Sequence, residues 1–574
     1  MKSNNYIKTI KAFSIAAGIL FLSVGCDDFL AEKEVPRIGN EFYKTKQGVL
    51  SAVDATYSYM RYGVGGEFTN LFTELGTDLI VGAVGGISKP TDSYNSGLNP
   101  AWENLHNWWE NNYKAINITN EVLQALPEIE GMSESEKRQC TSEMRFFRGY
   151  YYFDLVQQFG SIPLVTVADP VSVRTDFKRA PVSNIYNQII SDLRYAEENL
   201  NETATEKKGK ATKYAAAHLL AKVYLTRGSA VAEQRGQQTT DMDSTLYYAR
   251  KVIGNTKYAL LDNFSDLWDI DNMGNKEVIF SVQFTYDLIY NGGGNYGHLY
   301  WCSSYESVPG MVRDIANGRP WGFHRPTNKV MFELFDRKND SRFYKSFRWV
   351  NYANKAEKGL AIGDTAIYYS LNAPKPGSTH KYTYFQWNKE DETKNNDRYP
   401  SLIKHFDPKR ATVAEQRGSR EWVRMRLGET YLIAAEAAGR KGDYTTAITY
   451  INKLRERAAW KADEAKYPQY WIEEGGEEGD TNSTFPLIKV TENDIKTNFV
   501  DFMLDERGRE LLGEYYRWED LVRCEKLVEY VTKWNATAAR NIKDYHRVRP
   551  IPQKHIDRLN PRGPIEEEQN KGYF

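Results

Sequence analysis

Aromatic side chains gather in two stretches of this sequence that have the composition of loops. Tyr290–Trp321 has the highest density of rings, and Thr77–Asn99, rich in Gly, Ser and Asn, leads into Trp102. A pyranose presents a face of C–H groups that packs on a Trp or Tyr ring, while its hydroxyl groups need polar partners at the edges. The candidate platforms are Trp102, Tyr300, Trp301 and Trp321, and the candidate hydrogen-bonding residues are Asp78, Asn95 and Arg319.

Each of these residues also has a purely structural explanation. Leu105, Trp109, Tyr113 and Ile116 follow Trp102 at helical spacing, which is typical of a stripe packed in a core. Trp102 stands at the start of that stripe, beside the loop, and is the ring of the stripe that we expect to be exposed. A single exposed ring elsewhere needs no ligand to explain it.

Motifs for catalysis are absent or incomplete. Gly292–Gly297 satisfies the GxGxxG pattern, but it follows a predicted strand without opening a helix, so a flexible loop is the better interpretation. Asp505, Glu506 and Glu510 lie at helical spacing beside arginines, which favours ion pairs over a pair of catalytic carboxylates. No HExxH or GxSxG motif occurs. We therefore predict no catalytic residue.

Metal-binding patterns are incomplete as well. Asp269, Asp271 and Gly274 resemble part of a calcium-binding loop, but Met273 and Phe280 stand where oxygen ligands are required. The 4 cysteines include no CxxC pair, so neither a zinc knuckle nor a disulfide framework is indicated. We predict no metal site and no cofactor.

The charge balance argues against one class of partner. The 574 residues carry 75 Lys and Arg against 76 Asp and Glu, and no long basic run occurs, so nucleic-acid binding has no electrostatic support. Aromatic residues make up 13% of the chain although its mean hydropathy is -0.62. A chain this polar cannot easily bury all its rings, so we expect some of them to face water at a binding surface.

The segment 1–25 has the architecture of a secretory signal. A positively charged start is followed by the apolar run Ala12–Val24, and Gly25 stands directly before Cys26. LSVGC is similar to the lipobox of bacterial lipoproteins, although Ser23 occupies the place where Leu is usual. The motif predicts cleavage before Cys26 and lipidation of that residue. The alternative is an ordinary secretory signal with an incidental cysteine.

Helical pairs are the elements that must position the candidate loops. Leu427–Arg457 has the pattern of two antiparallel helices joined at Gly442, with small residues on the facing surfaces at tetratricopeptide spacing. One such hairpin cannot bury its apolar face alone, so it needs neighbours. Further helices are predicted over Thr45–Tyr62, Ala101–Leu126, Ser133–Gln158 with a capping box at its start, Pro181–Leu200, Ala211–Arg227, Leu246–Ile253 and Asp494–Arg523.

A different kind of region separates the helical blocks. Lys276–Tyr286 alternates like a strand, and the aromatic loops surround it. We predict a mainly α fold, a tetratricopeptide-like superhelix of helical pairs with an irregular, mixed α/β middle subdomain. The predicted regions are a signal peptide at 1–25, a helical region at 26–257, an aromatic-rich subdomain with short strands at 258–418, and a region with the hairpin at 419–574.

Several segments resemble the SusD/RagB family of outer-membrane lipoproteins. Glu143–Val165 is similar to the family helix that ends in an FG-x-[IV]-P-L turn, and Trp321–Arg342 to its WG-x-x-x-PT and D-x-R motifs. The most specific matches are Asp505–Arg523, DERGRELLGEYYRWEDLVR, and Arg549–Phe574, which begins RPIPQKHIDRLNP and ends QNKGYF. Together the matches span nearly the whole chain after the signal.

The resemblance implies a superhelical fold and a non-enzymatic function. Members of the family capture nutrients, usually glycans, at the cell surface as lids on SusC-like TonB-dependent transporters. The implied partners are an oligosaccharide or polysaccharide, such a transporter, and the outer membrane through a lipid on Cys26. Binding loops vary within the family, so it gives their locations and not their residues. The alternatives are a peptide-binding RagB-like lid, a glycoside-active enzyme and a purely structural partner of the transporter.

Overall fold

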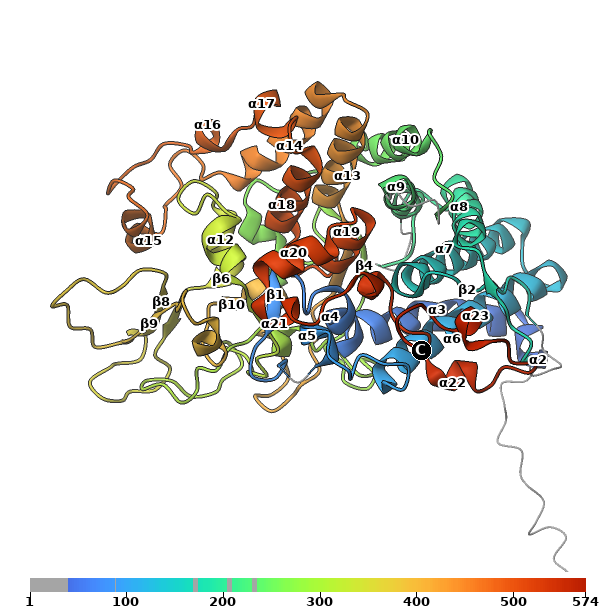
Figure 1. Ribbon diagram of the computed structural model, residues 1–574, viewed down its shortest axis with the longest axis horizontal. Coiled ribbons are helices and arrows are strands. Elements are labelled where there is room, and N and C mark those ends of the chain that lie inside the picture. The colour runs from blue at the N-terminus through green and yellow to red at the C-terminus, as the bar shows by residue number, and fades with distance from the viewer. Residues whose placement is uncertain (1–39, 88, 169–173, 204–208, 230–234) are drawn as a thin grey trace, which may run out of the picture.

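The computed structural model describes residues 40–87, 89–168, 174–203, 209–229 and 235–574 (Figure 1). The signal segment 1–25 and the predicted lipidation site, Cys26, lie outside these residues. The described part of the chain consists mainly of helices with a few short strands, which confirms the predicted fold class.

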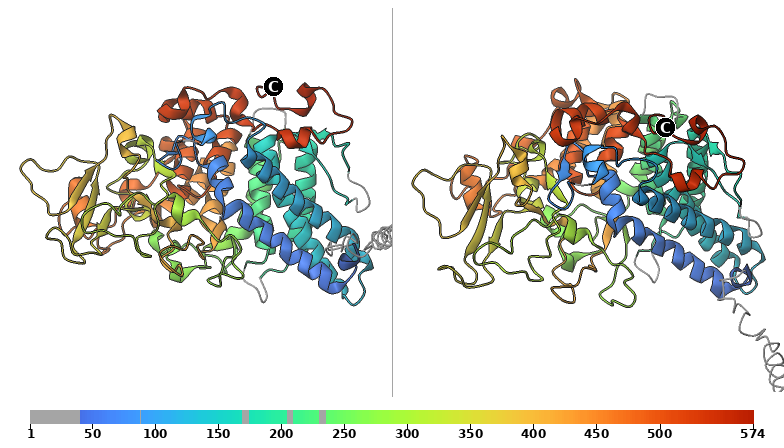
Figure 2. Two further views of the ribbon diagram at one scale, coloured as in Figure 1. Left: turned by 90° about the horizontal axis from the view of Figure 1, so that it is seen from below. Right: turned by 60° about the horizontal axis from the view of Figure 1, so that its bottom comes forward.

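Long helices form the frame of the molecule. They are α3 (Lys46–Val64), α6 (Glu103–Ala125), α7 (Glu134–Phe159), α8 (Val182–Asn199), α9 (Lys213–Ser229), α10 (Asp241–Ile253), α13 (Leu427–Arg440) and α14 (Tyr444–Ala458). Each packs on the next, from α3 on α6 through α10 on α13 to α13 on α14. Figure 2 shows the blue to green helices of this frame lying side by side. The predicted helical pairs are therefore present and stacked in sequence order.

Small side chains allow these helices to approach closely. Ala217 and Ala221 of α9 and Ala434 and Ala438 of α13 are fully buried, and α10 packs against both helices. Alanine-sized side chains keep the space between helix axes small. Gly442, with a φ of 82°, makes the turn between α13 and α14 as predicted, because glycine adopts that backbone conformation without steric cost.

Helix α7 begins at the predicted capping box and is tied to its neighbour by charge. The Glu136 backbone N–H donates to Ser133 Oγ at 3.3 Å, and the Ser133 backbone N–H donates to Glu136 Oε2 at 2.8 Å. Farther along α7, the Arg148 guanidinium donates two hydrogen bonds of 2.8 Å to Asp192 on α8. This buried, bidentate pair fixes α7 against α8.

Short sheets lie beside the helical frame, with β7–β9 at the left of Figure 1. The antiparallel pairs are β1 (Ile80–Gly82) with β5 (His324–Pro326), β2 (Ile162–Pro163) with β3 (Arg179–Ala180), β4 (Val278–Val282) with β11 (Trp422–Arg426), and β6 (Phe347–Arg348) with β10 (Ser401–Leu402). A three-stranded sheet has β8 (Thr365–Ser370) at its centre, paired with antiparallel β7 (Val350–Tyr352) on one side and parallel β9 (Thr383–Gln386) on the other. The predicted strand at Lys276–Tyr286 is thus β4, shortened at both ends.

The remaining helices connect these parts. They are α2 (Asn40–Tyr43), α4 (Glu67–Thr73), α5 (Pro90–Ser93), α11 (Gly297–Tyr300), α12 (Arg342–Ser346), α15 (Pro468–Glu473), α16 (Phe485–Ile488), α17 (Glu492–Ile495), α18 (Phe499–Leu511), α19 (Arg517–Arg523), α20 (Leu527–Trp534), α21 (Ala536–Ala539), α22 (Gln553–Ile556) and α23 (Ile565–Glu568). The prediction of one helix over Asp494–Arg523 is wrong, since α17, α18 and α19 are separate there.

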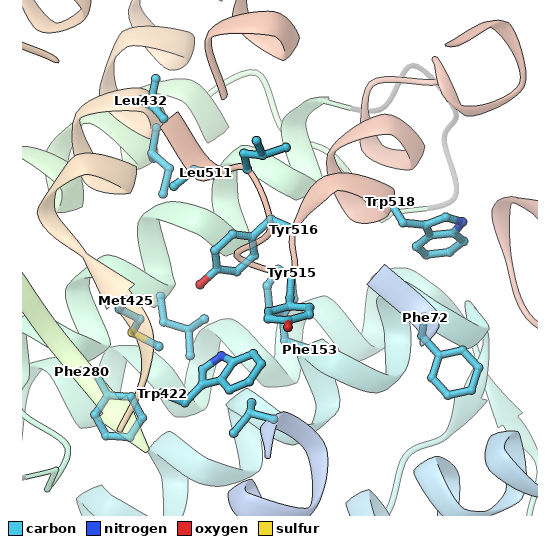
Figure 3. Packing of buried hydrophobic residues seen from close by; sticks show 14 of the residues in the cluster. Phe72, Phe153, Phe280, Trp422, Met425, Leu432, Leu511, Tyr515, Tyr516 and Trp518 are labelled. Atoms are coloured by element: carbon cyan, nitrogen blue, oxygen red, sulfur yellow. The ribbon is translucent and has the colours of Figure 1, made fainter. Parts of the chain in front are cut away.

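Between α18 and α19 the chain first leaves the helical conformation at Leu512, with a ψ of 120°, and at Gly513, with a φ of 71°. Tyr515 has a φ of 69°, which a continuous helix does not allow. The backbone N–H groups of Tyr515 and Tyr516 donate to Glu74 Oε1 at 2.6 and 3.2 Å, so a side chain from the N-terminal region replaces their helical acceptors. Figure 3 shows the result, with both tyrosines turned toward the core near Trp422 of β11. The Tyr515 and Trp422 ring centroids are 4.4 Å apart.

Buried charges join the frame to the middle of the molecule. Glu510 of α18 accepts hydrogen bonds from Arg342 of α12 at 2.9 Å, from Arg426 of β11 at 2.7 Å, and from Arg457 of α14. Glu277, just before β4, accepts from Arg426 and Arg457, each at 3.0 Å. We call these five residues the Glu510 cluster. All five side chains are nearly inaccessible, so each charge depends on its partners.

Candidate functional site

Three of the predicted ligand-binding residues lie in the protein core. Asp78 is 0% exposed, and Tyr300 and Trp301 are each 1% exposed. A ligand cannot reach these side chains while the residues that cover them stay in place. Their burial corrects the expectation that the polar and aromatic groups of both loops face water.

Asp78 is part of a buried ion-pair cluster. Its Oδ2 accepts from Lys329 Nζ at 2.9 Å and from Arg517 Nη2 at 2.6 Å. Burial alone would raise the pKa of Asp78, but the charges of Arg517 and Lys329 hold it well below its usual range. Asp78 therefore ties the start of β1 to α19, which is a structural role.

Tyr300 ends α11 and Trp301 directly follows it, and both side chains face inward. Trp301 Nε1 donates to Tyr515 Oη at 2.8 Å, and the Trp301 ring meets the His324 ring edge-on with 4.7 Å between centroids. The Tyr300 ring stacks on Phe323 with 5.1 Å between centroids. These contacts satisfy the polar atom of Trp301 and leave neither ring free for a ligand.

Asn95 and Trp102 are half-buried beside the C-terminal part of the chain. Asn95 Oδ1 accepts the backbone N–H two residues later at 2.8 Å, which closes a turn. The Trp102 ring packs edge-on against Phe72 with 5.4 Å between centroids. Between Asn95 and Trp102, Pro100 O accepts a hydrogen bond of 2.8 Å from Gln553 N at the start of α22, which holds this segment in place. Both residues are thus engaged in local packing.

Trp321 and Arg319 remain at the surface, and Trp321 lies among further aromatic rings. Its ring centroid is 5.8 Å from that of Tyr296, which it meets edge-on, and 5.7 Å from that of Phe323. All three rings are half-buried, so each combines contact with the protein and exposure to solvent. We call Tyr296, Trp321 and Phe323 the Trp321 patch.

Backbone hydrogen bonds from two distant segments hold the patch in place. Gly85 N donates to Gly322 O at 2.8 Å, and Phe323 N donates to Tyr300 O at 2.9 Å. A Cβ atom on Gly85 would lie 2.3 Å from both the Phe323 ring and the Trp321 carbonyl oxygen. A glycine is therefore required where the loop after β1 crosses the patch, and this crossing brings the two loop regions together.

Cationic and exposed apolar residues lie on the segments that carry or cross the rings. Lys89 Nζ lies 5.1 Å from the centroid of the phenylalanine ring of the patch, within the range of a cation–π interaction. Arg319 Nη1 donates to Ala414 O at 2.9 Å and remains half-buried. Val84 and Ile87, in the loop after β1, are 62% and 47% exposed. The segments around the patch therefore combine partly exposed rings, exposed apolar residues and cationic hydrogen-bond donors.

Two members of the patch were not among the sequence-based candidates. Tyr296 lies in the aromatic run, and Phe323 follows the Trp321-Gly322 pair, so adjacency was an available signal for both. Lys89 had no such signal. Its place beside Phe323 depends on the pairing of Gly85 with Gly322, which no pattern in the sequence indicates.

The acidic residues of α18 are engaged in ion pairs, as predicted. Glu506 Oε2 lies 2.6 Å from Arg455 Nη2, and Glu510 pairs with Arg457. In the part of the chain that the structure describes, no group of three or more His, Cys, Asp or Glu side chains is arranged to hold a metal ion. No helix among the described residues is both long and apolar enough to cross a membrane.

Family comparisons match most of the chain. The model of the SusD family matches residues 267–573, and a model described as starch-binding associating with outer membrane matches residues 81–225. The SusD-like protein P25 of Formosa agariphila is 25% identical over 592 aligned positions, which cover 97% of this chain and 98% of that protein. The starch-binding protein SusD of Bacteroides thetaiotaomicron is 25% identical over 482 positions, covering 78% and 75%.

A solved structure shows the same fold. A laminarin-binding SusD-like protein superposes with a TM-score of 0.64 at 22% sequence identity, covering 92% of this chain and 100% of that one. The family model for residues 267–573 alone spans more than half of the sequence. Motifs, fold and family match agree, and they show that this chain belongs to the SusD family.

Proposed function

We propose that this protein is a non-enzymatic glycan-binding protein of the cell surface that captures an oligosaccharide and passes it to a SusC-like TonB-dependent transporter. The observation that carries the proposal is the Trp321 patch, in which three rings are half-buried, Lys89 lies 5.1 Å from the Phe323 ring, and half-buried Arg319 stands two residues before Trp321. Such rings stack on the C–H face of a sugar, and cationic donors at the edge bond its hydroxyl groups.

The names of similar proteins support a carbohydrate ligand. One relative is named as a starch-binding protein, and one protein of the same fold is named as laminarin-binding. Ring platforms select the shape of a sugar more than its linkage, so the proposal names the class of ligand. In this account the helical frame supports the site and docks the transporter, while the loops around Trp321 hold the glycan.

The ligand class is tested by titrating the soluble, lipid-free protein with plant, host and microbial glycans and with a peptide mixture. We expect heat of binding with at least one glycan and none with the peptides. Binding of peptides alone would favour a peptide-binding lid and reject the glycan proposal. No binding of either class would favour a purely structural partner of the transporter.

The absence of catalysis is tested with the glycan that binds. We expect no reducing sugar to be released after prolonged incubation, because the buried carboxylates Glu506 and Glu510 of α18 are paired with arginines. Hydrolysis above the level of a protein-free control would support a glycosidase instead.

The membrane anchor and the transporter are tested in cells. We propose that Cys26 is lipidated and holds the protein on the outer membrane, on the basis of the LSVGC motif and the family match. Cys26→Ala should move the protein from the membrane fraction to the soluble fraction, while the unsubstituted protein should copurify with a TonB-dependent transporter in detergent. Unchanged fractionation contradicts the anchor, and purification without a transporter contradicts the complex.

A further inference from the structure

A pocket of about 320 Å³ lies in the helical frame, where α22 packs on α6 at the right of Figure 1. Its walls come from α6, from the chain around Val165, from Thr175 and its neighbours, and from α22 with the residues that follow it. No residue of the Trp321 patch lines it. Its volume is within the range of small-molecule sites, about 300–1,000 Å³.

Aromatic rings in fixed orientations form part of the pocket wall. The Trp109 ring contacts both Tyr113 and His555, with 4.9 Å between ring centroids in each pair and interplanar angles of 44° and 45°. Tyr113 Oη donates to Pro163 O at 2.8 Å, which fixes that ring. Tyr113 and His555 are half-buried and line the cavity. Such a wall matches a flat or chair-shaped six-membered ring.

Arg558 supplies an uncompensated positive charge at the pocket. Its side chain is exposed and lines the cavity, and it makes no ion pair or side-chain hydrogen bond with any residue that the structure describes. The other charges there have partners, since Arg174 Nε is 3.1 Å from Asp176 Oδ1 and Glu110 Oε2 is 3.3 Å from Lys114 Nζ. A bound anion would supply the negative partner that the Arg558 guanidinium lacks.

The histidine in the wall adds no second charge. Burial, together with the nearby charges of Arg558 and Arg179, lowers the pKa of His555 to about 4. His555 is therefore neutral near pH 7 and acts as an aromatic wall, while Arg558 remains the cation that faces an incoming ligand.

We propose that this pocket binds a small carboxylate carried on a six-membered ring. The ring packs against Tyr113 and His555, and the carboxylate accepts hydrogen bonds from the Arg558 guanidinium. Both sugar acids and aromatic acids have this chemistry. The inference does not rest on the glycan proposal, because it concerns other residues and a different part of the fold.

The test is titration of the full-length soluble protein with glucuronate, 4-hydroxybenzoate and, as a neutral ring, glucose. We expect at least one acid to bind and glucose to bind at least tenfold more weakly. Arg558→Gln should weaken binding of that acid by about tenfold, the scale of one charge-assisted hydrogen bond. Arg562→Gln is the matched control, since Arg562 is exposed in the same segment but does not line the pocket, and should leave the affinity unchanged.

A second variant tests the location independently of charge. Asn117 is an exposed residue of α6 that lines the pocket, so Asn117→Trp should fold normally, fill the cavity and abolish binding of the acid. Trp321→Ala should leave the affinity for the acid unchanged, which separates this site from the glycan site. Failure of both acids to bind, binding of glucose as tight as either acid, or an unchanged affinity in Arg558→Gln would overturn the proposal.

Discussion

Trp301 and Trp321 belong to one aromatic run, but their surroundings give them opposite roles. Trp301 is 1% exposed and donates its indole N–H to Tyr515 Oη, whereas Trp321 is half-buried at the surface. Trp301 directly follows α11 (Gly297–Tyr300), whose residues are all buried, whereas Trp321 precedes the Gly322 carbonyl that pairs with the loop after β1. Residue type alone therefore locates the aromatic region but does not assign a role to each ring.

Trp301→Ala should destabilise the fold and not act on ligand binding directly. Removing a buried indole leaves a cavity next to His324 and His405, at a cost of about 3–5 kcal/mol in the free energy of unfolding. Denaturant unfolding measures this loss. Unfolding at the same denaturant concentration as the wild type would show that Trp301 is not a core residue.

Glu74 is a second residue whose role depends on burial. It is 1% exposed, and desolvation raises the pKa of its carboxyl group to about 8, although hydrogen bonds from the Tyr515 and Tyr516 backbones lower it. In the unfolded chain the same group has the usual pKa of about 4.5. The folded state thus binds a proton that the unfolded state has lost, and stability from this group is lost as pH rises from 4.5 to 8.

Glu74→Gln should therefore change the pH dependence of stability. Glutamine keeps a carbonyl oxygen for the two backbone donors and carries no titrating proton. The free energy of unfolding of the variant relative to the wild type should increase between pH 4.5 and pH 8, by up to about 1.4 kcal/mol per pH unit, and level off above pH 8. Denaturant unfolding at several pH values checks this, and parallel pH profiles would contradict it.

At the scale of elements, the hairpin of α13 and α14 was predictable because its signals are local. Small residues at helical spacing and the Gly442 turn lie within one short stretch of sequence. The start of α7 was predictable for the same reason, since Ser133 and Glu136 form a capping box across one helical turn.

Ala447→Leu should measure how closely α14 packs on α13. Ala447 is fully buried on α14, and a leucine there would overfill the interface at a cost of about 1–3 kcal/mol. Thr449→Leu places the same side chain on the exposed face of the same helix and should change stability by less than about 0.5 kcal/mol. Equal unfolding midpoints for the two variants would show that the helices are not closely packed.

Elements whose geometry depends on distant residues were not predictable. The helical pattern of Asp494–Arg523 continues through the break before α19, where Gly513 is the local signal, but the backbone donors of Tyr515 and Tyr516 there are held by Glu74, more than 400 positions away. The make-up of the candidate site also depends on contacts between distant segments. Trp321 was identified from its own segment, whereas Lys89 reaches the patch only through the contact of Gly85 with Gly322.

At the scale of the whole molecule, the Glu510 cluster joins regions that are separate in sequence. Glu510→Gln would leave Arg342, Arg426 and Arg457 buried with one carboxylate fewer, so the free energy of unfolding should fall by about 3–5 kcal/mol. Glu456→Gln, which removes an exposed pair with Lys453, should cost less than about 1 kcal/mol. Denaturant unfolding compares them, and similar losses would mean that the cluster does not join the regions.

The mainly α architecture follows from the sequence because each helical pair needs neighbours to bury its apolar face. The spatial course of the middle region cannot be predicted in this way, because its sheets pair short strands that are distant in sequence, such as β1 with β5. A ring in such a region is buried or exposed according to these pairings. Asp78, Tyr300 and Trp301 are accordingly buried, whereas Trp321 is half-buried.

The most direct test of the proposed function is the affinity of a bound glycan for the wild type and for Trp321→Ala. Loss of one stacking ring should weaken binding by about 1–3 kcal/mol, as measured by calorimetry, with the fold intact. Tyr247→Ala, which removes a ring on α10 that is 56% exposed, is the control and should bind like the wild type. Glycan binding that is equally tight in the wild type and in Trp321→Ala would contradict the account.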